Sequence, residues 1–266
     1  MDAPQAVAAP GLPGGSLAGS AFVVIGGGGG IGREVVRQLA ARDARLLIAG
    51  RDAGRLAAAA QLAKRAEVVE VDATDFAAVE ACLQRGRDLG DGRLAGVALC
   101  VGSIVLKPAH ATSAAEWQQV IATNLTTAFA VVRGAAKTMR DGGSVVLCSS
   151  AAASVGLANP EAIAAAKAGI EGLVRAAAAS HAGRGLRCNA VAPGLVRTGL
   201  AAAITGNARA LAASERMHPL GRIGEPHDIA AAITWLLGPE SGWVTGEVLH
   251  VDGGLAHVRP VERTTA

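Results

Sequence analysis

The sequence predicts an α/β protein with one doubly wound parallel sheet of about seven strands and helices on both faces. Two observations support this prediction. Short apolar runs of strand length alternate with longer stretches of helical pattern, and such alternation produces right-handed crossovers and a parallel sheet. The runs are rich in Val, Ile and Leu without regularly alternating polar residues, so we expect both faces of the sheet to be buried.

The apolar runs predict the strands in chain order. They are AFVVIG (21–26), RLLIAG (45–50), EVVEVD (67–72), LAGVALCVG (94–102), SVVLCSS (144–150), LRCNAVAPG (186–194) and EVLHVDGG (247–254). Helical patterns lie between them at 27–43, 51–65, 74–90, 113–140, 160–183 and 225–238. No linker interrupts the alternation. We therefore expect one domain over 20–266, preceded by a flexible tail over 1–19 that is rich in Pro and Gly.

Composition disfavours several classes of function. The 25 basic and 22 acidic residues are spread along the chain with no basic stripe, which argues against nucleic-acid binding. Aromatic residues make up only 2% of the chain, too few for a base-stacking platform. The four cysteines have no metal-binding or disulfide pattern and are interpreted as buried free thiols. Neither a membrane span nor a secretory signal is recognisable, so the expected location is the cytoplasm.

A run of glycines follows the first predicted strand and opens the first predicted helix. Within IGGGGGIG, the spacing GxxxGxG is met by Gly26, Gly30 and Gly32. A tight turn between strand and helix needs backbone angles that glycine adopts readily. The start of the helix then offers unpaired N–H groups and the positive end of its dipole to a pyrophosphate. In this context the motif predicts a dinucleotide-binding site.

With this motif the chain resembles the short-chain dehydrogenase/reductase family, from about residue 20 to the DGG at 252–254. Further family motifs follow in order: VDATD, TNLTTAF, GGSVVLCSS, NAVAPGLVRT and VTGEVLHVDGG. The resemblance implies a Rossmann fold, a nicotinamide cofactor and a small-molecule substrate. The implied cofactor contacts are Gly26, Gly30, Ile31, Gly32, Asp72, Ala73, Gly102, Lys167, Pro193, Gly194, Val196 and Thr198. The implied catalytic residues are Asn124, Ser150 and Lys167.

The end of the second predicted strand distinguishes the two nicotinamide cofactors. A carboxylate there would bind the ribose hydroxyls of NAD, but the strand ends with Gly50, and Arg51 follows. A guanidinium pairs with a 2′-phosphate through two hydrogen bonds and can lie flat on the adenine. Asp52 competes as a ribose ligand, although its position is typical of the N-cap of the next helix. We therefore predict NADP, with NAD as the alternative.

One catalytic residue of the family is missing. The family motif is YxxxK, with the catalytic serine thirteen residues before the tyrosine. Counting from Lys167 and from Ser150 leads to the same residue, Ile163, and the chain contains no tyrosine. Ketone reduction places negative charge on oxygen, and a positioned acid contributes about 10²–10⁴-fold in rate, or about 3–5.5 kcal/mol of barrier. Isoleucine supplies neither an acid nor a base.

Three hypotheses follow from this loss. In the first, Ser150 hydrogen-bonds the oxyanion, and the proton comes from Glu161 or from water held by Lys167 or Asn124. Glu161 also suits the simpler role of a carboxylate that interacts with the helix dipole. In the second, the substrate is a conjugated enone or enoyl thioester, whose enolate depends less on an acid. In the third, the protein is a catalytically silent NADP-binding homologue that acts as a sensor or a partner subunit.

Other residues near the expected site give weaker indications. The fourth strand ends LCVG, so Gly102 is retained from the family's NNAG, while Cys100 is interpreted as packing. His110 follows the fourth strand at the carboxyl edge of the sheet, and His218 could face the substrate. Both are candidate acids, although a histidine in a loop is more often structural.

Three longer segments bear on the substrate and on assembly. The small, apolar segment 199–217 predicts a lid over the substrate. Small residues over 123–136 and 162–179 favour close helix packing. The family resemblance implies a homotetramer or homodimer formed through these long helices.

Overall fold

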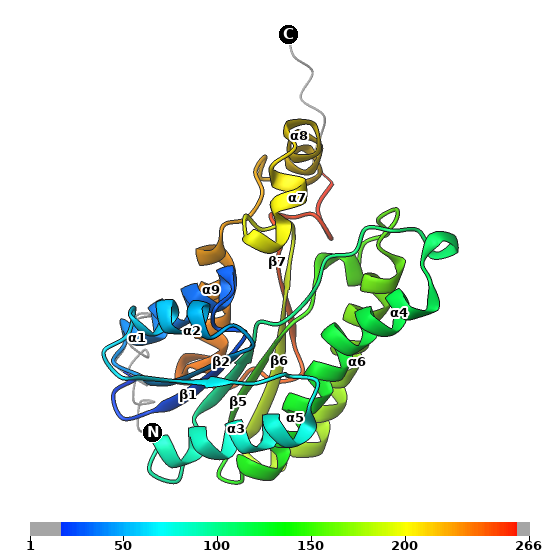
Figure 1. The fold of residues 1–266 in the computed structure, drawn as a ribbon. Helices are drawn as coiled ribbons and strands as arrows, with labels where there is room; N and C mark the ends of the chain where they lie inside the picture. Colours follow the sequence, from blue (N-terminus) through cyan, green and yellow to red (C-terminus); the bar gives the residue numbers. More distant parts are fainter. Residues whose placement is uncertain (1–16, 260–266) are drawn as a thin grey trace, which may run out of the picture.

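The computed structural model describes residues 17–259 and contains one parallel sheet with helices packed against it (Figure 1). The strand order is β3-β2-β1-β4-β5-β6-β7. The strands are β1 (Ala21–Ile25), β2 (Arg45–Gly50), β3 (Ala66–Glu70), β4 (Gly96–Leu99), β5 (Gly143–Cys148), β6 (Leu186–Pro193) and β7 (Val248–Val251). The α-helices are α1 (Gly30–Ala40), α2 (Ala53–Ala60), α3 (Phe76–Leu89), α4 (Ala114–Ile121), α5 (Thr127–Thr138), α6 (Glu161–His181), α7 (Ala202–Thr205), α8 (Ala208–Met217) and α9 (Pro226–Leu237). The predicted doubly wound sheet is confirmed. Within 17–259, no helix combines the length and apolarity that crossing a bilayer requires.

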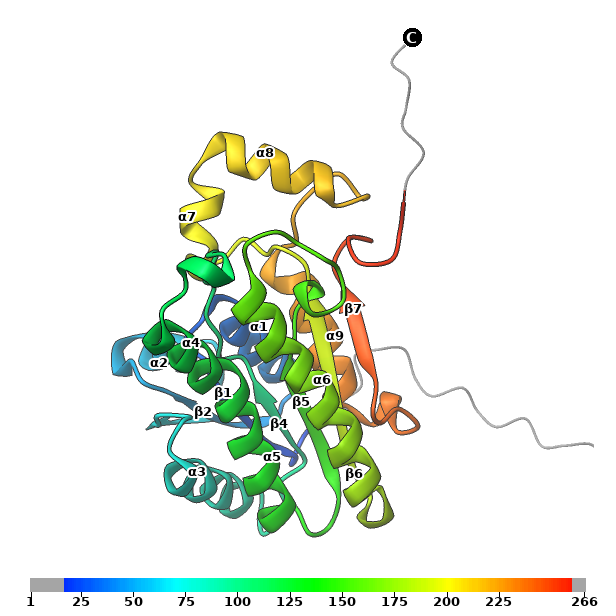
Figure 2. The same cartoon turned by 90° about the vertical axis from the view of Figure 1, so that its right-hand side faces the viewer.

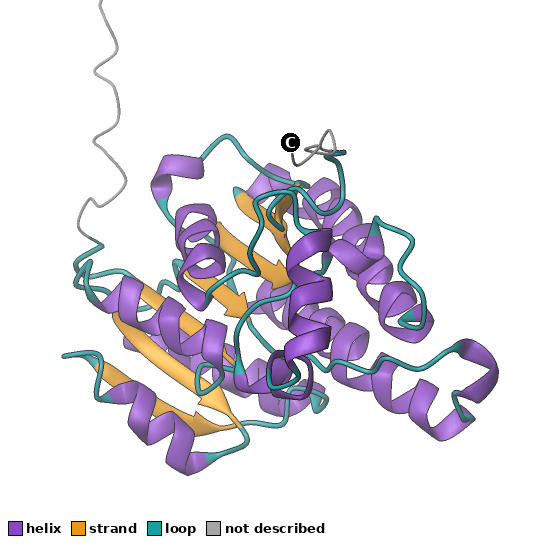
Figure 3. Cartoon of the chain, turned by 90° about the horizontal axis from the view of Figure 1, so that it is seen from above, coloured by secondary structure: helices purple, strands orange, loops and turns teal. Residues whose placement is uncertain are grey.

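The strand order creates a crevice at the carboxyl edge of the sheet. β1 pairs with β2 on one side and with β4 on the other, so successive crossovers leave the centre of the sheet in opposite directions. Seen from above, helices flank the strands on both sides (Figure 3). Ligands of doubly wound sheets bind outside the carboxyl ends of the strands at this switch point. The glycine turn after β1 and the loop after β4 both lie there.

Two apolar cores join the sheet to its helices. On one face, side chains such as Val23 and Val97 pack with α3, α5 and α6. On the other face, their sequence neighbours Val24 and Ala98 pack with α1, α2 and α9. Successive side chains of a strand point to opposite faces, so a strand covered on both sides must be apolar throughout. This explains the unbroken apolar runs of the central strands.

The edge strands do not have the two buried faces that the sequence predicted. In β3, Val68 is 40% exposed, and Glu67 and Glu70 are also exposed. β3 has a strand neighbour on one side only, and Glu67 forms an exposed ion pair of 2.7 Å with Arg85 of α3. The four residues of β7 at the opposite edge are all partly exposed. Charged side chains at such an edge oppose pairing with another chain.

The folded domain begins earlier than the predicted boundary at residue 20. Leu17 is only 5% exposed and belongs to the core beside α1. Its backbone N–H donates to the carbonyl of Arg42 at 2.7 Å. Burial of this side chain therefore places 17–19 within the domain, whereas 1–16 of the predicted tail lies outside the described residues.

The helical pattern over 113–140 contains a widened turn. α4 begins with a capping box formed by Ser113 and Glu116, and it leads into a π-helical turn over Ala122–Thr126 before α5 begins. Such turns often occur at functional sites. Here the turn contains Asn124, whose side chain is completely buried.

The segment predicted as a lid forms short helices above the carboxyl edge of the sheet. α7 and α8 project away from the sheet and its flanking helices (Figure 2). α8 has no fully buried residue, and Leu200 and Met217 near the ends of the segment are 55% and 47% exposed. Few buried contacts therefore hold this segment, as expected of an element that moves.

Candidate functional site

The glycine turn after β1 forms a cradle that excludes side chains. Gly26 has a φ of +83°, and a Cβ there would lie 2.8 Å from the carbonyl carbon of Cys100. A Cβ on Gly30 would lie 2.8 Å from Cγ2 of Thr198, and a Cβ on Gly32 would collide with the carbonyl oxygen of Gly26. Any of these side chains would displace its neighbours. The three glycines therefore keep bare backbone at the crevice.

The N-terminus of α1 is open to an anion. Its N-cap is Gly29, which provides no side-chain cap, and its first turn contains no acidic residue. The N–H groups of Gly30, Ile31 and Gly32 lie in this first turn, while the half-buried Ile31 also packs against the core. Uncapped N–H groups and the helix dipole favour a bound phosphate. The cradle therefore fits the pyrophosphate of a dinucleotide.

Asp72, one of the implied cofactor contacts, lies after β3. Oδ1 accepts hydrogen bonds from the N–H and the hydroxyl of Thr74, at 2.9 and 2.8 Å. These two bonds, assisted by the positive charge of Arg51, lower the pKa of the Asp72 carboxyl. The side chain is exposed, whereas that of Ala73 is only 5% exposed. The turn after β3 therefore presents the Asp72 carboxylate to solvent, while the buried Ala73 side chain fixes the turn to the core.

The end of β2 carries the side chains that bear on cofactor choice. Asp52 accepts a hydrogen bond from the N–H of Arg55 at 2.9 Å and caps α2, as the sequence predicted. It also forms an exposed ion pair with the Arg55 guanidinium at 3.2 Å. Arg51 is exposed, and the ion pairs found among residues 17–259 do not include it. Asp52 therefore has a structural role, and Arg51 has its guanidinium available.

Gly102, Asn124 and Lys167, hereafter the lysine cluster, converge beside the carboxyl end of β4. A Cβ on Gly102 would lie 3.2 Å from Oδ1 of Asn124 and 3.4 Å from Nζ of Lys167. Oδ1 of Asn124 accepts from the N–H of Ser103 at 3.2 Å, and its Nδ2 donates to Oγ of Ser103 and to the carbonyl of Val120, both at 2.9 Å. These bonds hold Asn124 rigidly and brace the loop after β4.

Lys167 brings a buried ammonium to the cluster. Its side chain lies on α6, is 6% exposed, and donates from Nζ to the carbonyl of Cys148 at 2.8 Å. An ammonium has three N–H groups, so two remain for a ligand hydroxyl or water. Burial lowers the pKa of Lys167, and the nearby thiols of Cys148 and Cys100 partly oppose this effect. A lysine in this setting gives up a proton more readily than an exposed one.

Ser150 lies just beyond β5, at the start of a short 3₁₀ turn. Its Oγ accepts a hydrogen bond from the N–H of Ala152 at 3.2 Å, which leaves the hydroxyl hydrogen for a ligand. The preceding Ser149 connects this loop to α6, because its Oγ donates to Oε1 of Glu171 at 2.9 Å. Ser150, the residue predicted to hydrogen-bond the oxyanion, therefore follows the end of β5, where Lys167 contacts the carbonyl of Cys148.

Ile163 occupies the position of the missing acid and lies in apolar surroundings. It is one helical turn before Lys167, so both residues share a face of α6. Its side chain is 6% exposed. The buried residues of its cluster are Val120, Ala162 and Ala166. Glu161, by contrast, is exposed at the start of α6, in the setting of a helix-start carboxylate rather than the enclosed setting that a proton donor would need.

The loop after β6 faces the glycine turn. β6 ends at Pro193, and the buried Val196 pairs in an isolated bridge with Gly224. Thr198 then lies against Gly30, as its close approach to the position of a Cβ shows. The structure thus brings together the predicted contacts from the first and the sixth strands.

Neither of the two histidines considered as acids lies in the lysine cluster. His218 is 3% exposed; its Nδ1 hydrogen-bonds the carbonyl of Ser214 at 2.7 Å, and its Nε2 accepts from the N–H of Leu195 at 3.2 Å. Both ring nitrogens are therefore used to join α8 to the loop after β6. His110 lies in an exposed 3₁₀ turn after β4.

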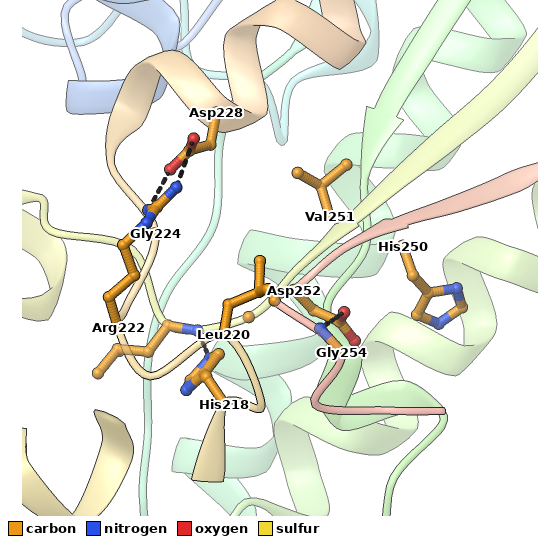
Figure 4. A pocket seen from close by; sticks show the side chains of 12 residues that line it. His218, Leu220, Arg222, Gly224, Asp228, His250, Val251, Asp252 and Gly254 are labelled. Carbon is orange, nitrogen blue, oxygen red and sulfur yellow. Dashed lines mark hydrogen bonds and ion pairs between the residues drawn. The ribbon is translucent and has the colours of Figure 1, made fainter. Parts of the chain in front are cut away.

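A cavity of about 260 Å³ lies beyond Gly194 (Figure 4). Its charged lining is already paired: Arg222 contacts Asp228 at 2.7 Å, and Asp252 accepts from the N–H of Gly254 at 2.9 Å. Gly194 and the candidate acid His218 are the predicted site residues in its lining, and the lysine cluster lies outside it. We therefore interpret this cavity as a space between the loop after β6 and the end of β7, apart from the lysine cluster.

The sequence pattern did not indicate two contributors to the site. Ser103 was missed because its hydrogen bonds to Asn124 join residues 21 positions apart. The contact between Cys148 and Lys167 was missed because it uses a backbone carbonyl, which leaves no trace in residue type. Only the position of Cys148 just before the predicted serine could have suggested proximity.

The fold and the site together define a class of protein. A doubly wound sheet, a side-chain-free phosphate cradle at its switch point and a lysine cluster at the same edge describe a Rossmann-type oxidoreductase. A family model described as "Enoyl-(Acyl carrier protein) reductase" matches residues 26–256. The chain belongs to the short-chain dehydrogenase/reductase family.

Characterised relatives extend over nearly the whole chain. Galactitol 2-dehydrogenase (L-tagatose-forming) from Cereibacter sphaeroides is 36% identical and covers 90% of this chain and 95% of its own length. The 3-oxoacyl-[acyl-carrier-protein] reductase FabG of Vibrio harveyi is 32% identical, with coverage of 90% and 98%. A solved short-chain dehydrogenase/reductase structure from Mycobacterium ulcerans has a TM-score of 0.86 and 32% identity, with 91% of both chains covered.

Proposed function

We propose that the protein is an NADP(H)-dependent oxidoreductase that transfers hydride to or from a carbonyl or conjugated carbonyl, of 3-oxoacyl or enoyl type, without a tyrosine acid. The observation that carries this proposal is the lysine cluster at the crevice, beside the phosphate cradle. A chain that had lost all catalysis would need Lys167 for binding at most, yet Ser150 and the rigidly held Asn124 remain as well.

The residues that would hold NADP(H) come from several strand ends. Gly26, Gly30 and Gly32 with the first turn of α1 would bind the pyrophosphate. Arg51 would pair with the 2′-phosphate, which the capping role of Asp52 supports. Lys167 would donate to a ribose hydroxyl. When bound, the nicotinamide supplies or accepts the hydride.

Ser150 and Lys167 would together provide the proton that tyrosine supplies elsewhere. The Ser150 hydroxyl would donate to the oxygen of the substrate as negative charge develops there. Lys167, with its lowered pKa and two remaining N–H groups, would hold a water that delivers the proton. The three hydrogen bonds of the Asn124 side chain leave it as a brace, and the exposed Glu161 takes no part.

A conjugated carbonyl substrate makes the least demand on this site. Hydride added to the β-carbon leaves an enolate, which the donors Ser150 and Lys167 could stabilise by hydrogen bonding before a proton arrives from solvent. The description of the matching family model as an enoyl reductase also supports this substrate class.

The alternative function is a catalytically silent NADP-binding homologue that acts as a sensor or as the partner of an active subunit. The buried, apolar setting of Ile163 favours it, because that setting contains no polar group to replace the phenol. Pull-down from the native host tests this function. Recovery of a related active dehydrogenase subunit with the protein supports it, and its absence counts against it.

Assembly through the long helices remains part of the proposal. α5 exposes Phe129 (47%), and a Cβ on Gly172 of α6 would meet no atom within 4 Å. A small residue beside open space on one helix and an exposed aromatic on the next are features of a helix-packing surface. We therefore propose a homotetramer or homodimer formed through α5 and α6, which sedimentation analysis can test.

The function is tested in two steps with purified protein. Calorimetric titration with NADPH and NADH should show tighter binding of NADPH. NADPH consumption should then be followed with a panel of ketones, 3-oxoacyl thioesters and enoyl thioesters. Binding without turnover of any compound would reject catalysis and leave the silent function, whereas no binding of either dinucleotide would reject both.

A further inference from the structure

Two cysteines lie opposite each other on the central strands. β4 and β5 are parallel, and their register pairs Leu99 with Leu147. The next pair along this register is Cys100 and Cys148, and both side chains pack toward the core beside α1 and α9. Adjacent strands are about 4.7–4.9 Å apart. Since disulfide-linked Cα atoms are usually roughly 4.4–6.8 Å apart, the strand spacing places this pair within the usual Cα range for a disulfide.

The pair lies on the floor of the crevice. A Cβ on Gly26 of the phosphate cradle would lie 2.8 Å from the carbonyl carbon of Cys100. Nζ of Lys167 lies 2.8 Å from the carbonyl oxygen of Cys148. The two cysteines therefore lie between the phosphate cradle and the lysine cluster, along the path that a dinucleotide would take.

Their surroundings differ from those of the other two cysteines. Cys82 and Cys188 are each 3% exposed, and burial raises the pKa of each thiol to about 12. Cys100 and Cys148 are only partly buried. A hydrogen bond from the Cys100 thiol, together with the charge of Lys167, lowers the pKa of Cys148. A thiolate is the reactive form, so the Cys148 thiol should react first, with Cys100, whose pKa is raised by the same hydrogen bond and by burial, as its partner.

We propose that Cys100 and Cys148 form a modification site, a dithiol that a hydroperoxide converts to an internal disulfide and that a bound dinucleotide covers. Protection of the dithiol by a bound dinucleotide rests on the proposed function, whereas disulfide formation does not. Neither cysteine has an assigned part in hydride transfer. Oxidation would therefore act on cofactor binding, by locking the floor of the crevice.

The chemistry balances in two steps. The thiolate of Cys148 attacks one peroxide oxygen, the O–O bond breaks, and the sulfur becomes a sulfenic acid while water leaves after protonation. The sulfur of Cys100 then attacks the sulfenic sulfur, forming S–S and breaking S–O, with release of a second water. In sum, two thiols are oxidised and one hydrogen peroxide is reduced to two waters. A dithiol reductant reverses the bond by thiol–disulfide exchange.

The experiment uses the full-length protein and hydrogen peroxide. Intact mass should fall by two hydrogen atoms, and a non-reducing peptide map should join the peptides of Cys100 and Cys148. Dithiothreitol should restore the original mass. Cys100→Ala and Cys148→Ala should each abolish the product, while the matched control Cys188→Ala should retain it. The wild-type map identifies the joined residues even if a variant fails to fold.

Protection of the dithiol by the dinucleotide is tested by measuring the rate of disulfide formation in the same reaction with NADP⁺ present. At ten times its Kd, the ligand leaves about one-eleventh of the protein free, so the oxidation rate should fall about tenfold. Disulfide formation at an equal rate, with NADP⁺ binding shown by calorimetry, would reject the covering but retain the dithiol. Absence of NADP⁺ binding would instead reject the proposed function. Sulfinic acid on a single cysteine, or a bond to Cys82 or Cys188, would overturn the dithiol itself.

Discussion

Replacement of Ile163 by tyrosine tests whether the rest of the active site is intact. Ile163 is 6% exposed and shares a helical face with Lys167. Tyrosine would add a ring and a hydroxyl to the cluster that contains Val120 and Ala166. Overpacking of this kind costs about 1–3 kcal/mol of unfolding free energy, so we expect a lower but measurable stability.

The expected gain in catalysis is larger than this cost. A positioned acid contributes about 10²–10⁴-fold, which is equivalent to about 3–5.5 kcal/mol of barrier. Two N–H groups of Lys167 remain beyond its bond to the Cys148 carbonyl, so its charge is available to lower the pKa of a new phenol. We therefore expect Ile163→Tyr to raise ketone reduction by about 10²-fold or more.

The assay follows NADPH consumption with a panel of simple ketones. Ile163→Phe is the matched control, because it introduces the same ring without the hydroxyl. Thermal unfolding and NADPH titration of both variants establish that they fold and bind alike. If Ile163→Tyr then reduces ketones no faster than Ile163→Phe, the remaining residues are not in a productive arrangement, and the reasoning from Lys167 and Ser150 is refuted.

Four other changes have expected outcomes. Arg51→Ala should weaken NADPH binding by about 1.5–3 kcal/mol in calorimetry and leave NADH binding unchanged; an equal loss for both would contradict the 2′-phosphate contact. Glu161→Gln should change the rate of the most active substrate by less than about twofold, because the side chain is exposed, and a loss of about tenfold or more would identify it as the donor. Gly32→Ala should cost about 1–3 kcal/mol of stability in denaturant unfolding and abolish dinucleotide binding, since its Cβ would meet backbone; retention of binding would count against the cradle. The hydrogen bond from Arg222 is the main cause that lowers the Asp228 pKa from 3.8 to about 2, so this carboxylate stabilises the fold above about pH 4 and loses that effect as pH falls toward 2. Asp228→Asn should therefore lower stability by roughly 0.5–1 kcal/mol at neutral pH and by much less below pH 2, and a difference that persists undiminished in acid would reject the ionic cause.

The sequence alone was sufficient for the order of the elements, and it supplied the candidate residues of the site as predictions. Strand-length apolar runs and helical patterns are local properties, so the doubly wound sheet was predictable from them. The cradle at Gly26, Gly30 and Gly32 was predictable because turn geometry restricts the residue type directly. The presence of isoleucine at the position of the catalytic tyrosine followed from the spacing of Ile163 from Ser150 and from Lys167.

Only the tertiary structure decided which of these residues contact one another and which already have hydrogen-bond partners. The sequence left His218 as a candidate acid, but its two ring nitrogens form hydrogen bonds with the carbonyl of Ser214 and the N–H of Leu195. The exposure of β3 depended on its place at the sheet edge, and the facing of Cys100 and Cys148 depended on the register of β4 against β5. Burial, register and partner choice arise between segments far apart in the chain, so no local pattern records them.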